Sequence, residues 1–221
     1  ILLKHTVETY EQQKEFIGNA SHELQTPLAI ATNKLELLIE KGNLQDEQAK
    51  NIAEIMSIIE RLVRLNKSLL LLTKIENQQF LDNQTVSLND IVKQNVSDLD
   101  EIAEFKNIKI SVSETAQLTA FMDVSLANVV VSNLLRNAIF HNEDHGMVQI
   151  EISDKAIKIS NTGIKAPINE QQLFSRFHKT ANNSNGTGLG LAIVKAVCHL
   201  YGFIIQYRYG NNLHCFEWQV K

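Results

Sequence analysis

Apolar side chains recur at every third or fourth position along two segments near the start of the chain. The first segment contains Ile17, Ala20, Leu24, Leu28, Ala31, Leu35 and Leu38. The second contains Ile52, Ile55, Ile59, Leu62, Leu65, Leu69 and Leu72. This spacing places each set on one side of a long helix. Gly42 interrupts the pattern, and Asp46 is a suitable residue to cap the second helix. The sequence therefore predicts an antiparallel helical hairpin.

A lone hairpin has little to bury its apolar stripes against. A second copy would bury both stripes, so we expect a homodimer in which two hairpins form a four-helix bundle. The hairpin is predicted to span residues 1–76, followed by a polar linker over 77–84 that can act as a hinge. Residues 85–221 are then expected to form a separate domain.

The pattern in this second region mixes strict alternation with helical spacing. We predict a short strand followed by a helix cap at 86–90, and strands at 108–112, 148–152, 156–159, 203–209 and 213–220. Helices are predicted over 91–105, 124–141 and 189–200. A polar stretch that contains glycines covers 161–186. The fold class expected is α+β, with the helical hairpin followed by an α/β sandwich.

Composition narrows the range of partners. Apolar residues make up 44% of the chain and charged residues 21%, which is typical of a soluble globular protein. The net charge of −4 gives no general attraction to nucleic acid. No stretch approaches the ~20 apolar residues that span a bilayer. We therefore expect no nucleic-acid partner, and contact with a membrane only through segments outside this chain.

The first candidate for chemistry is His22, which falls outside the apolar stripe and should face solvent. Glu23 follows it directly, and a carboxylate beside an imidazole can orient the ring and accept its proton. Pro27 cannot donate a hydrogen bond to the carbonyl of Glu23, so the helix is expected to bend or loosen just past His22. These residues predict a nucleophilic histidine at a site that can move.

The string Ser21-His22-Glu23-Leu24-Gln25-Thr26-Pro27-Leu28 resembles the H box of sensor histidine kinases. That resemblance implies that His22 is the phosphoacceptor and that Glu23 acts as acid and base. It also implies that Thr26 positions a water for dephosphorylation of the partner protein. All three positions match the usual form of the motif.

Three further strings follow in the order that this family predicts. Asn133 and Asn137 lie four residues apart and share one helical face. Their amide oxygens suit a hard cation. The string from Asn133 to Ala138 resembles the N box, which implies that Asn137 holds Mg²⁺ and that the domain binds ATP. Phe140 stands where the family often has a lysine that reaches the phosphates. Arg136 and His141 are the residues that could replace it.

The segment around Asn161 and Gly163 occupies the place of the G1 box, with two departures from the family pattern. The usual aspartate, which accepts a hydrogen bond from the adenine amino group, is Asn161. The second glycine is Lys165, which we expect to be solvated rather than to reach a phosphate. An amide carbonyl can still accept the adenine bond, but without charge, so weaker selectivity for adenine is expected.

Glycines at 186, 188 and 190 open the helix predicted from 189, where backbone amides can bind phosphate. Together with Thr187 and Leu189, they resemble the G2 box, and these five residues are expected to contact the nucleotide. The string from Leu173 to Phe177 resembles the F box. Residues 164–187 would then form a short ATP lid, which Phe174 and Phe177 pin to the core.

The resemblance implies a sensor histidine kinase core of a two-component system, the cytoplasmic portion of a bacterial inner-membrane sensor. It would use Mg-ATP to phosphorylate His22 and pass the phosphoryl group to an aspartate in the receiver domain of a response regulator, with phosphatase activity as a further option. Two alternatives stay open here. One is an inactive nucleotide-binding scaffold, which Asn161 and Phe140 support. The other is an ATPase resembling the gyrase and Hsp90 nucleotide domains, against which the H box argues.

Overall fold

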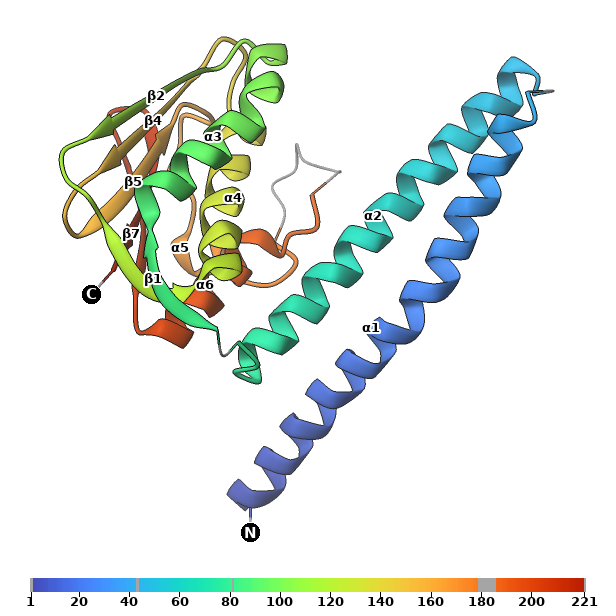
Figure 1. Cartoon of the computed structure of the whole chain (residues 1–221), viewed down its shortest axis with the longest axis horizontal. Coiled ribbons are helices and arrows are strands. Elements are labelled where there is room, and N and C mark those ends of the chain that lie inside the picture. Colours follow the sequence, from blue (N-terminus) through green and yellow to red (C-terminus); the bar gives the residue numbers. More distant parts are fainter. Residues whose placement is uncertain (1, 43, 81, 179–185, 221) are drawn as a thin grey trace.

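The computed structural model describes residues 2–42, 44–80, 82–178 and 186–220. Within the first helix, side chains are described from Gly18 onward, with the exception of His22. Helix α1 (Leu2–Glu40) and helix α2 (Asp46–Glu76) form an antiparallel hairpin that stands beside an α/β domain (Figure 1). The predicted hairpin and sandwich are both confirmed. No helix in these residues combines the length and the apolar character needed to cross a membrane.

The start of α2 differs from the prediction. The capping position is Gln45, not Asp46, and the Gln48 side chain accepts a hydrogen bond from the Gln45 amide at 3.1 Å. Asp46 instead lies in the first turn, where its negative charge interacts favourably with the helix dipole. Helix α1 continues without interruption through Pro27. The turn between the helices is closed by Gly42, whose φ of 69° is one that glycine adopts without strain.

The second region begins with a small antiparallel ribbon of strands β1 (Asn83–Ser87) and β3 (Thr119–Asp123). A mixed five-stranded sheet follows the order β2-β4-β5-β7-β6. Its strands are β2 (Lys109–Glu114), β4 (Met147–Ile152), β5 (Ala156–Asn161), β6 (Ile204–Gly210) and β7 (Leu213–Gln219). Only β2 and β4 pair in parallel, while the other neighbours in this sheet are antiparallel.

Three long helices cover one face of this sheet (Figure 1): α3 (Leu88–Phe105), α4 (Val124–Phe140) and α6 (Gly190–Tyr201). Alternate residues of the central strands point into the layer between sheet and helices. Ile150, Ile159 and Phe216 form one buried row across β4, β5 and β7. Ile152, Ile157 and Trp218 form the next row, also buried. This apolar layer is the core, and it supports the site at the other end of the strands.

Two short elements were not predicted. Strand β3 was missed, and helix α5 (Glu170–Leu173) lies within the stretch predicted to be an irregular lid. The N-cap of α3 is Ser87, whose hydroxyl accepts from the Asp90 amide at 3.4 Å, so this helix begins earlier than predicted. Both missed elements are short. They are stabilised by tertiary contacts and not by a long repeat of apolar residues.

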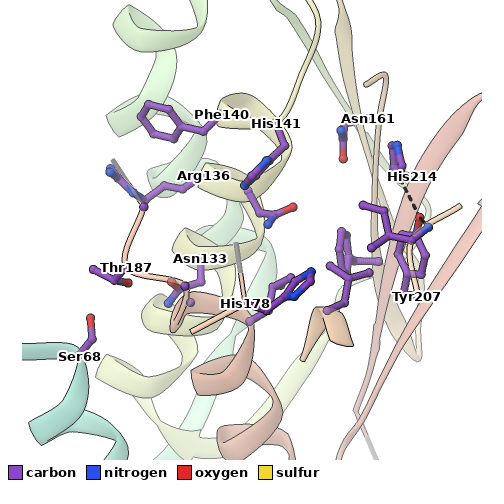
Figure 2. A pocket seen from close by; sticks show the side chains of 18 of the residues that line it. Ser68, Asn133, Arg136, Phe140, His141, Asn161, His178, Thr187, Tyr207 and His214 are labelled. Atoms are coloured by element: carbon purple, nitrogen blue, oxygen red, sulfur yellow. Dashed lines mark hydrogen bonds between the residues drawn. The ribbon is translucent and has the colours of Figure 1, made fainter. Parts of the chain in front are cut away.

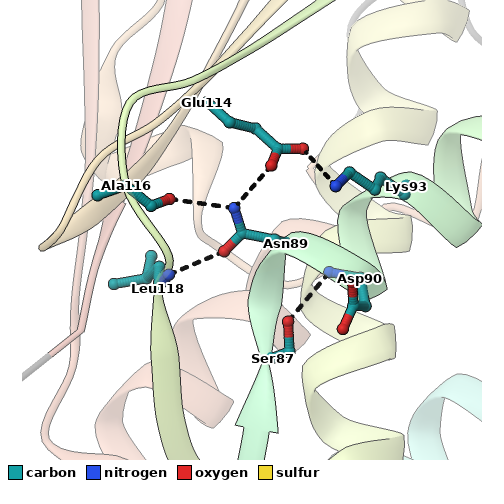
Figure 3. A network of polar contacts seen from close by, with 7 residues as sticks. All are labelled: Ser87, Asn89, Asp90, Lys93, Glu114, Ala116 and Leu118. Carbon is teal, nitrogen blue, oxygen red and sulfur yellow. Dashed lines mark hydrogen bonds and ion pairs between the residues drawn. The ribbon is translucent and has the colours of Figure 1, made fainter.

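A polar network joins α3 to the segment between β2 and β3 (Figure 3). Asn89 is fully buried, and its amide nitrogen donates to a Glu114 carboxylate oxygen at 3.0 Å and to the Ala116 carbonyl at 3.1 Å. Its amide oxygen accepts from the Leu118 backbone at 2.8 Å. Lys93 pairs with Glu114 at 3.0 Å. One asparagine thus fixes a connection that carries no regular structure of its own.

The end of α2 packs onto the α/β domain, against α6. Leu72 and Ile75 are 3% and 2% exposed, and both belong to the same apolar cluster as the sheet. Arg176 forms an ion pair with Glu76 at this junction. The last turns of α2 are therefore part of the packing of the second region. The division at residues 76 and 84 stays a prediction.

Candidate nucleotide site and phosphoacceptor helix

A cavity of about 730 Å³ lies where α4, α6 and the ends of the central strands meet, and α2 forms its remaining wall (Figure 2). Nine of the predicted nucleotide-contacting residues line it together. These are Asn133, Arg136, Asn137, His141, Asn161, Gly186, Thr187, Gly188 and Gly190. Residues from three distant parts of the sequence thus converge on one cavity, as the motifs predicted.

Helix α4 supplies one wall. The Asn133 side-chain nitrogen donates to the Val129 carbonyl at 2.7 Å, which leaves its amide oxygen facing α6. A Cβ at Gly190 would lie 2.7 Å from that oxygen, so the two helices approach closely here. Asn137 is half-buried on the same wall, and its side chain makes no hydrogen bond to the described residues. Its amide oxygen is therefore available to a cation, which fits the chemistry of a Mg²⁺ ligand.

Phe140 replaces a lysine that is frequent in the family, but other cations still lie beside the cavity. The Arg136 guanidinium lies 5.1 Å from the centre of the Phe140 ring, and the Lys106 ammonium lies 5.4 Å from it. Such cation–π contacts hold the Arg136 side chain beside the cavity that it lines. His141 lines the same wall, and burial lowers its pKa, with the nearby His214 and Lys106 as weaker causes. Its ring is therefore neutral near pH 7.

Asn161 provides a polar group at the floor of the cavity. It is 2% exposed, and its side-chain nitrogen donates to the Thr162 carbonyl at 2.6 Å. Because a carbonyl can only accept, this bond fixes which end of the amide is nitrogen. The Oδ1 atom is buried and accepts no hydrogen bond within the described part of the chain. An unpaired buried acceptor is costly, and a ligand amino group would satisfy it.

The glycine-rich string forms the approach to α6. No hydrogen bond from a described side chain caps the first turn of this helix, which leaves its amides available to a ligand. Gly188 has a φ of +71°, and a Cβ there would lie 2.8 Å from the Phe177 backbone. Glycine is therefore required at this position by both conformation and space. Within the string, the Thr187 hydroxyl accepts a hydrogen bond from the Leu189 amide at 3.3 Å.

Two residues of the predicted nucleotide set do not line the cavity. Leu189 is fully buried, because it serves as the N-cap of α6 and points into the core. Gly163 lies beneath the floor, where a Cβ would approach the His141 carbonyl to 2.8 Å and His214 to 3.3 Å. Both residues shape the site without facing the ligand. Lys165 is exposed and does not line the cavity, as expected.

The start of the lid is held by a hydrogen-bond chain that the sequence did not reveal. His214 is buried opposite Asn161 in the sheet, and its Nε2 lies 2.8 Å from the Ile164 carbonyl. Because that oxygen can only accept, Nε2 carries the proton. Its Nδ1 then accepts from the Tyr207 hydroxyl at 2.7 Å, which in turn accepts from the Ile168 amide at 3.3 Å. Burial raises the pKa of Tyr207, so the hydroxyl keeps its proton.

The two lid phenylalanines behave differently. Phe174 is buried and meets Phe216 edge-on, with ring centres 6.3 Å apart, as predicted for a residue that pins the lid. The prediction for Phe177 was wrong, because its side chain is 56% exposed. Its backbone carries the contact instead, with a φ of 61° and close packing against Gly188. Residues 179–185 lie outside the described part of the lid.

The phosphoacceptor helix is described in part. His22 lies in α1, but its side chain is outside the described residues, so its exposure stays a prediction. Glu23 and Thr26 are exposed on the same helix. On the neighbouring side, Asn66 of α2 donates to the Ser21 carbonyl at 2.6 Å. This buried bond joins α2 to the turn of α1 that contains His22.

Sequence reasoning missed six polar lining residues, which are Arg64, Lys67, Ser68, His178, Tyr207 and His214. Tyr207 and His214 alternate inward on the edge pair of strands, a signal that could have identified them as buried. Arg64 and Lys67 line the cavity from α2. Their spacing is that of an ordinary solvated helix face, so only the docking of α2 on the domain reveals their position.

Comparison with known families matches both regions. Residues 12–78 match the His Kinase A (phospho-acceptor) domain. Residues 122–215 match the histidine kinase-, DNA gyrase B- and HSP90-like ATPase family. The two matches follow one another in the order that the motifs predicted.

Curated relatives share the same arrangement over most of this chain. The heme sensor protein HssS of Staphylococcus saprophyticus is 31% identical over 198 residues, which are 86% of this chain and 42% of the relative. The HssS protein of Staphylococcus aureus strain Newman is 30% identical over 210 residues, which are 91% of this chain and 45% of the relative. The chain thus spans less than half the length of these relatives.

Solved structures show the same fold. The full-length ShkA structure in complex with AMPPNP has a TM-score of 0.74 at 22% identity, over 94% of this chain and 46% of that one. The Acinetobacter baumannii histidine kinase AdeS has a TM-score of 0.64 at 24% identity, over 90% of this chain and 97% of that one. The chain belongs to the sensor histidine kinases, of which it carries the phospho-acceptor domain followed by the ATPase domain.

Proposed function

We propose that this chain uses ATP to phosphorylate His22 and then transfers the phosphoryl group to an aspartate in the receiver domain of a response regulator. One observation carries the proposal. A single cavity combines an unpaired, buried acceptor at Asn161 with the uncapped, glycine-rich start of α6. A ligand with an amino group at one end and phosphates at the other satisfies both features.

ATP fits this pair of features. The amino group of adenine would donate to the Asn161 oxygen, and the phosphates would accept from the first amides of α6. Arg136, held against Phe140, adds a positive charge to the same cavity. Asn137 would hold a Mg²⁺ ion through its amide oxygen, and the ion supplies charge neutralisation at the phosphate oxygens when bound. ATP affinity therefore does not depend on a lysine at position 140.

At the acceptor end, an imidazole nitrogen of His22 forms the new bond to the γ-phosphorus, and the bond to the β,γ-bridging oxygen breaks. ADP leaves with the electron pair of that bond. Glu23, exposed beside His22, accepts the proton from the other ring nitrogen. Thr26 lies one turn further along α1 and is exposed to the solvent. We assign it the positioning of the water that dephosphorylates the partner.

The chain is further proposed to work as a homodimer and as the cytoplasmic portion of a bacterial membrane sensor. The first point is supported by large apolar side chains that stay exposed on the hairpin, such as Leu37, Ile55 and Ile58. The second is supported by the sensor relatives, of which this chain covers less than half.

Incubation with γ-labelled ATP tests the proposal. Wild-type protein should gain acid-labile label, His22→Ala should gain none while still binding ATP, and Asn137→Ala should bind and transfer far less. Exposed Asn51 gives the matched control, since Asn51→Ala removes an amide from α2 and should leave labelling unchanged. Undiminished label on His22→Ala would place the phosphoryl group elsewhere. ATP binding without any label would show that the chain is a scaffold.

A further inference from the structure

One face of α2 changes from cationic to apolar where the helix passes the cavity. Arg64, Lys67 and Ser68 line the cavity, and their spacing of three and four residues places them on a single side of the helix. One turn later, Leu71 packs against the apolar cluster and Leu72 is buried within it. The same helix is thus anchored by its apolar turn and presents a cationic turn to the cavity.

This placement is supported by several contacts. Leu72 and Ile75 lie within the apolar cluster of the second domain, and Glu76 pairs with Arg176 just beyond the end of α5. Ser68 and Thr187 both line the cavity, and Figure 2 shows them on the same side of it, away from Asn161 and His214. The cationic turn therefore faces the part of the cavity where the start of α6 offers its amides.

The charges in the cavity are unbalanced. Arg64, Lys67 and Arg136 line it, and no acidic residue does so among the described lining residues. Arg64 has Glu60 as its partner at 3.5 Å, but both side chains are largely exposed, and such pairs contribute little. Lys67 forms no ion pair within the described part of the chain. The cavity thus holds a local excess of positive charge that suits a polyanion.

We propose that Arg64 and Lys67 bind the terminal phosphates of the nucleotide, so that α2 of the phospho-acceptor domain forms part of the nucleotide site. This inference rests on the proposed function, because it requires that the cavity binds ATP. ATP carries one phosphate more than ADP, so the two cations strengthen ATP binding more than ADP binding. The docked arrangement of α2 is then favoured by ATP and released after the γ-phosphoryl group has left.

The test compares two double variants that remove the same charge. Arg64→Ala/Lys67→Ala removes the two cations in the cavity. Arg61→Ala/Lys74→Ala removes two exposed cations of α2 that do not line it. Isothermal titration measures the affinity of each protein for ADP and for an ATP analogue with a β,γ-imido bridge, with Mg²⁺ present. Far-ultraviolet circular dichroism confirms that both variants are folded.

The cavity variant should lose about tenfold in affinity for the ATP analogue and about threefold or less for ADP. The control should change by less than about twofold for both ligands, since exposed charges are screened. The swapped variant Arg64→Lys/Lys67→Arg should recover most of the preference for the triphosphate. Equal losses in the two double variants would overturn the inference while leaving ATP binding intact. A wild-type protein that binds neither ligand would instead contradict the proposed function.

Discussion

At the scale of single residues, the proposed nucleotide site makes Asn161 the residue that would distinguish a 6-amino from a 6-oxo purine. Its buried Oδ1 can only accept, because Nδ2 is committed to the Thr162 carbonyl. We expect Asn161→Leu to lower ATP affinity about tenfold, as a lost hydrogen bond to a buried group costs roughly 1–2 kcal/mol. Inosine triphosphate lacks the amino group, so its affinity should change little.

The comparison of the two nucleotides by competition titration isolates this one bond. In wild-type protein ATP should bind more tightly than inosine triphosphate, and in Asn161→Leu the difference should nearly vanish. A variant that weakens both nucleotides equally would mean that Asn161 supports the floor of the cavity and does not recognise the base. Lys165→Ala, at an exposed position outside the cavity, should leave both affinities unchanged.

Gly188 has a left-handed backbone and packs closely against its neighbours. A substitution there therefore has a conformational cost and a packing cost, and the two can be measured separately. Gly188→Ala should lower the free energy of unfolding by about 3 kcal/mol, because the φ of +71° adds roughly 1 kcal/mol and the contact with Phe177 adds the rest. Gly202→Ala meets only the first cost, since its φ is +67° and nothing lies within 4 Å of a Cβ. Urea titration measures whether Gly188→Ala loses more stability than Gly202→Ala. Equal losses would contradict the packing argument.

At the scale of elements, Asn89 joins α3 to the connection between β2 and β3 (Figure 3). Asn89→Ala leaves the buried Leu118 amide without its acceptor, so the free energy of unfolding should fall by about 2–3 kcal/mol. Chemical denaturation at pH 7 measures that loss. Lys93→Ala removes only a largely exposed charge from the same network and should have a much smaller effect.

Asn89→Ala should also change how stability depends on pH. The hydrogen bond from Asn89 is the largest cause that lowers the pKa of Glu114 below 4.5, and the bond from Lys93 is the next. A carboxyl with a lowered folded pKa stabilises the fold above pH 4.5, and this contribution is lost as the pH falls through the folded pKa. In Asn89→Ala the Glu114 pKa should rise toward its ordinary value, as a carbon-detected NMR titration would measure. An unchanged Glu114 titration would contradict this assignment.

Elements with a long repeat could be predicted from the sequence, and short ones could not. The hairpin and the three long helices each place many apolar residues at helical spacing, while β3 buries only Ala120 and Met122. The site followed the same rule. Asn133, Asn137 and Asn161 stand in recognisable strings, whereas Arg64 and Lys67 reach the cavity only because Leu72 and Ile75 dock α2 on another domain. No local pattern encodes that docking.

At the scale of the whole molecule, the hairpin leaves apolar side chains without cover. Leu37 and Ile58 are 54% and 58% exposed, and Leu24, Ile30, Leu38, Ile39, Ile55 and Leu62 are also exposed. Large exposed apolar surfaces mark sites of association. A second copy of the hairpin would bury them, which is why we expect a homodimer with a four-helix bundle at its centre.

A charge placed in this surface should therefore separate the subunits. In Leu37→Glu/Ile58→Glu a dimer would bury two unpaired carboxylates per chain, a cost that the remaining apolar contacts do not offset. Light scattering coupled to gel filtration should give the dimer mass for wild type and the monomer mass for this variant. Ser57→Glu is the matched control, because Ser57 lies on the opposite, polar side of α2 and should leave the dimer intact. A monomeric wild type, or a variant that remains dimeric, would show that another partner covers these side chains. If the bundle forms as expected, dissociation should also reduce labelling of His22, since α1 would lose the packing that orients the acceptor turn beside Asn66.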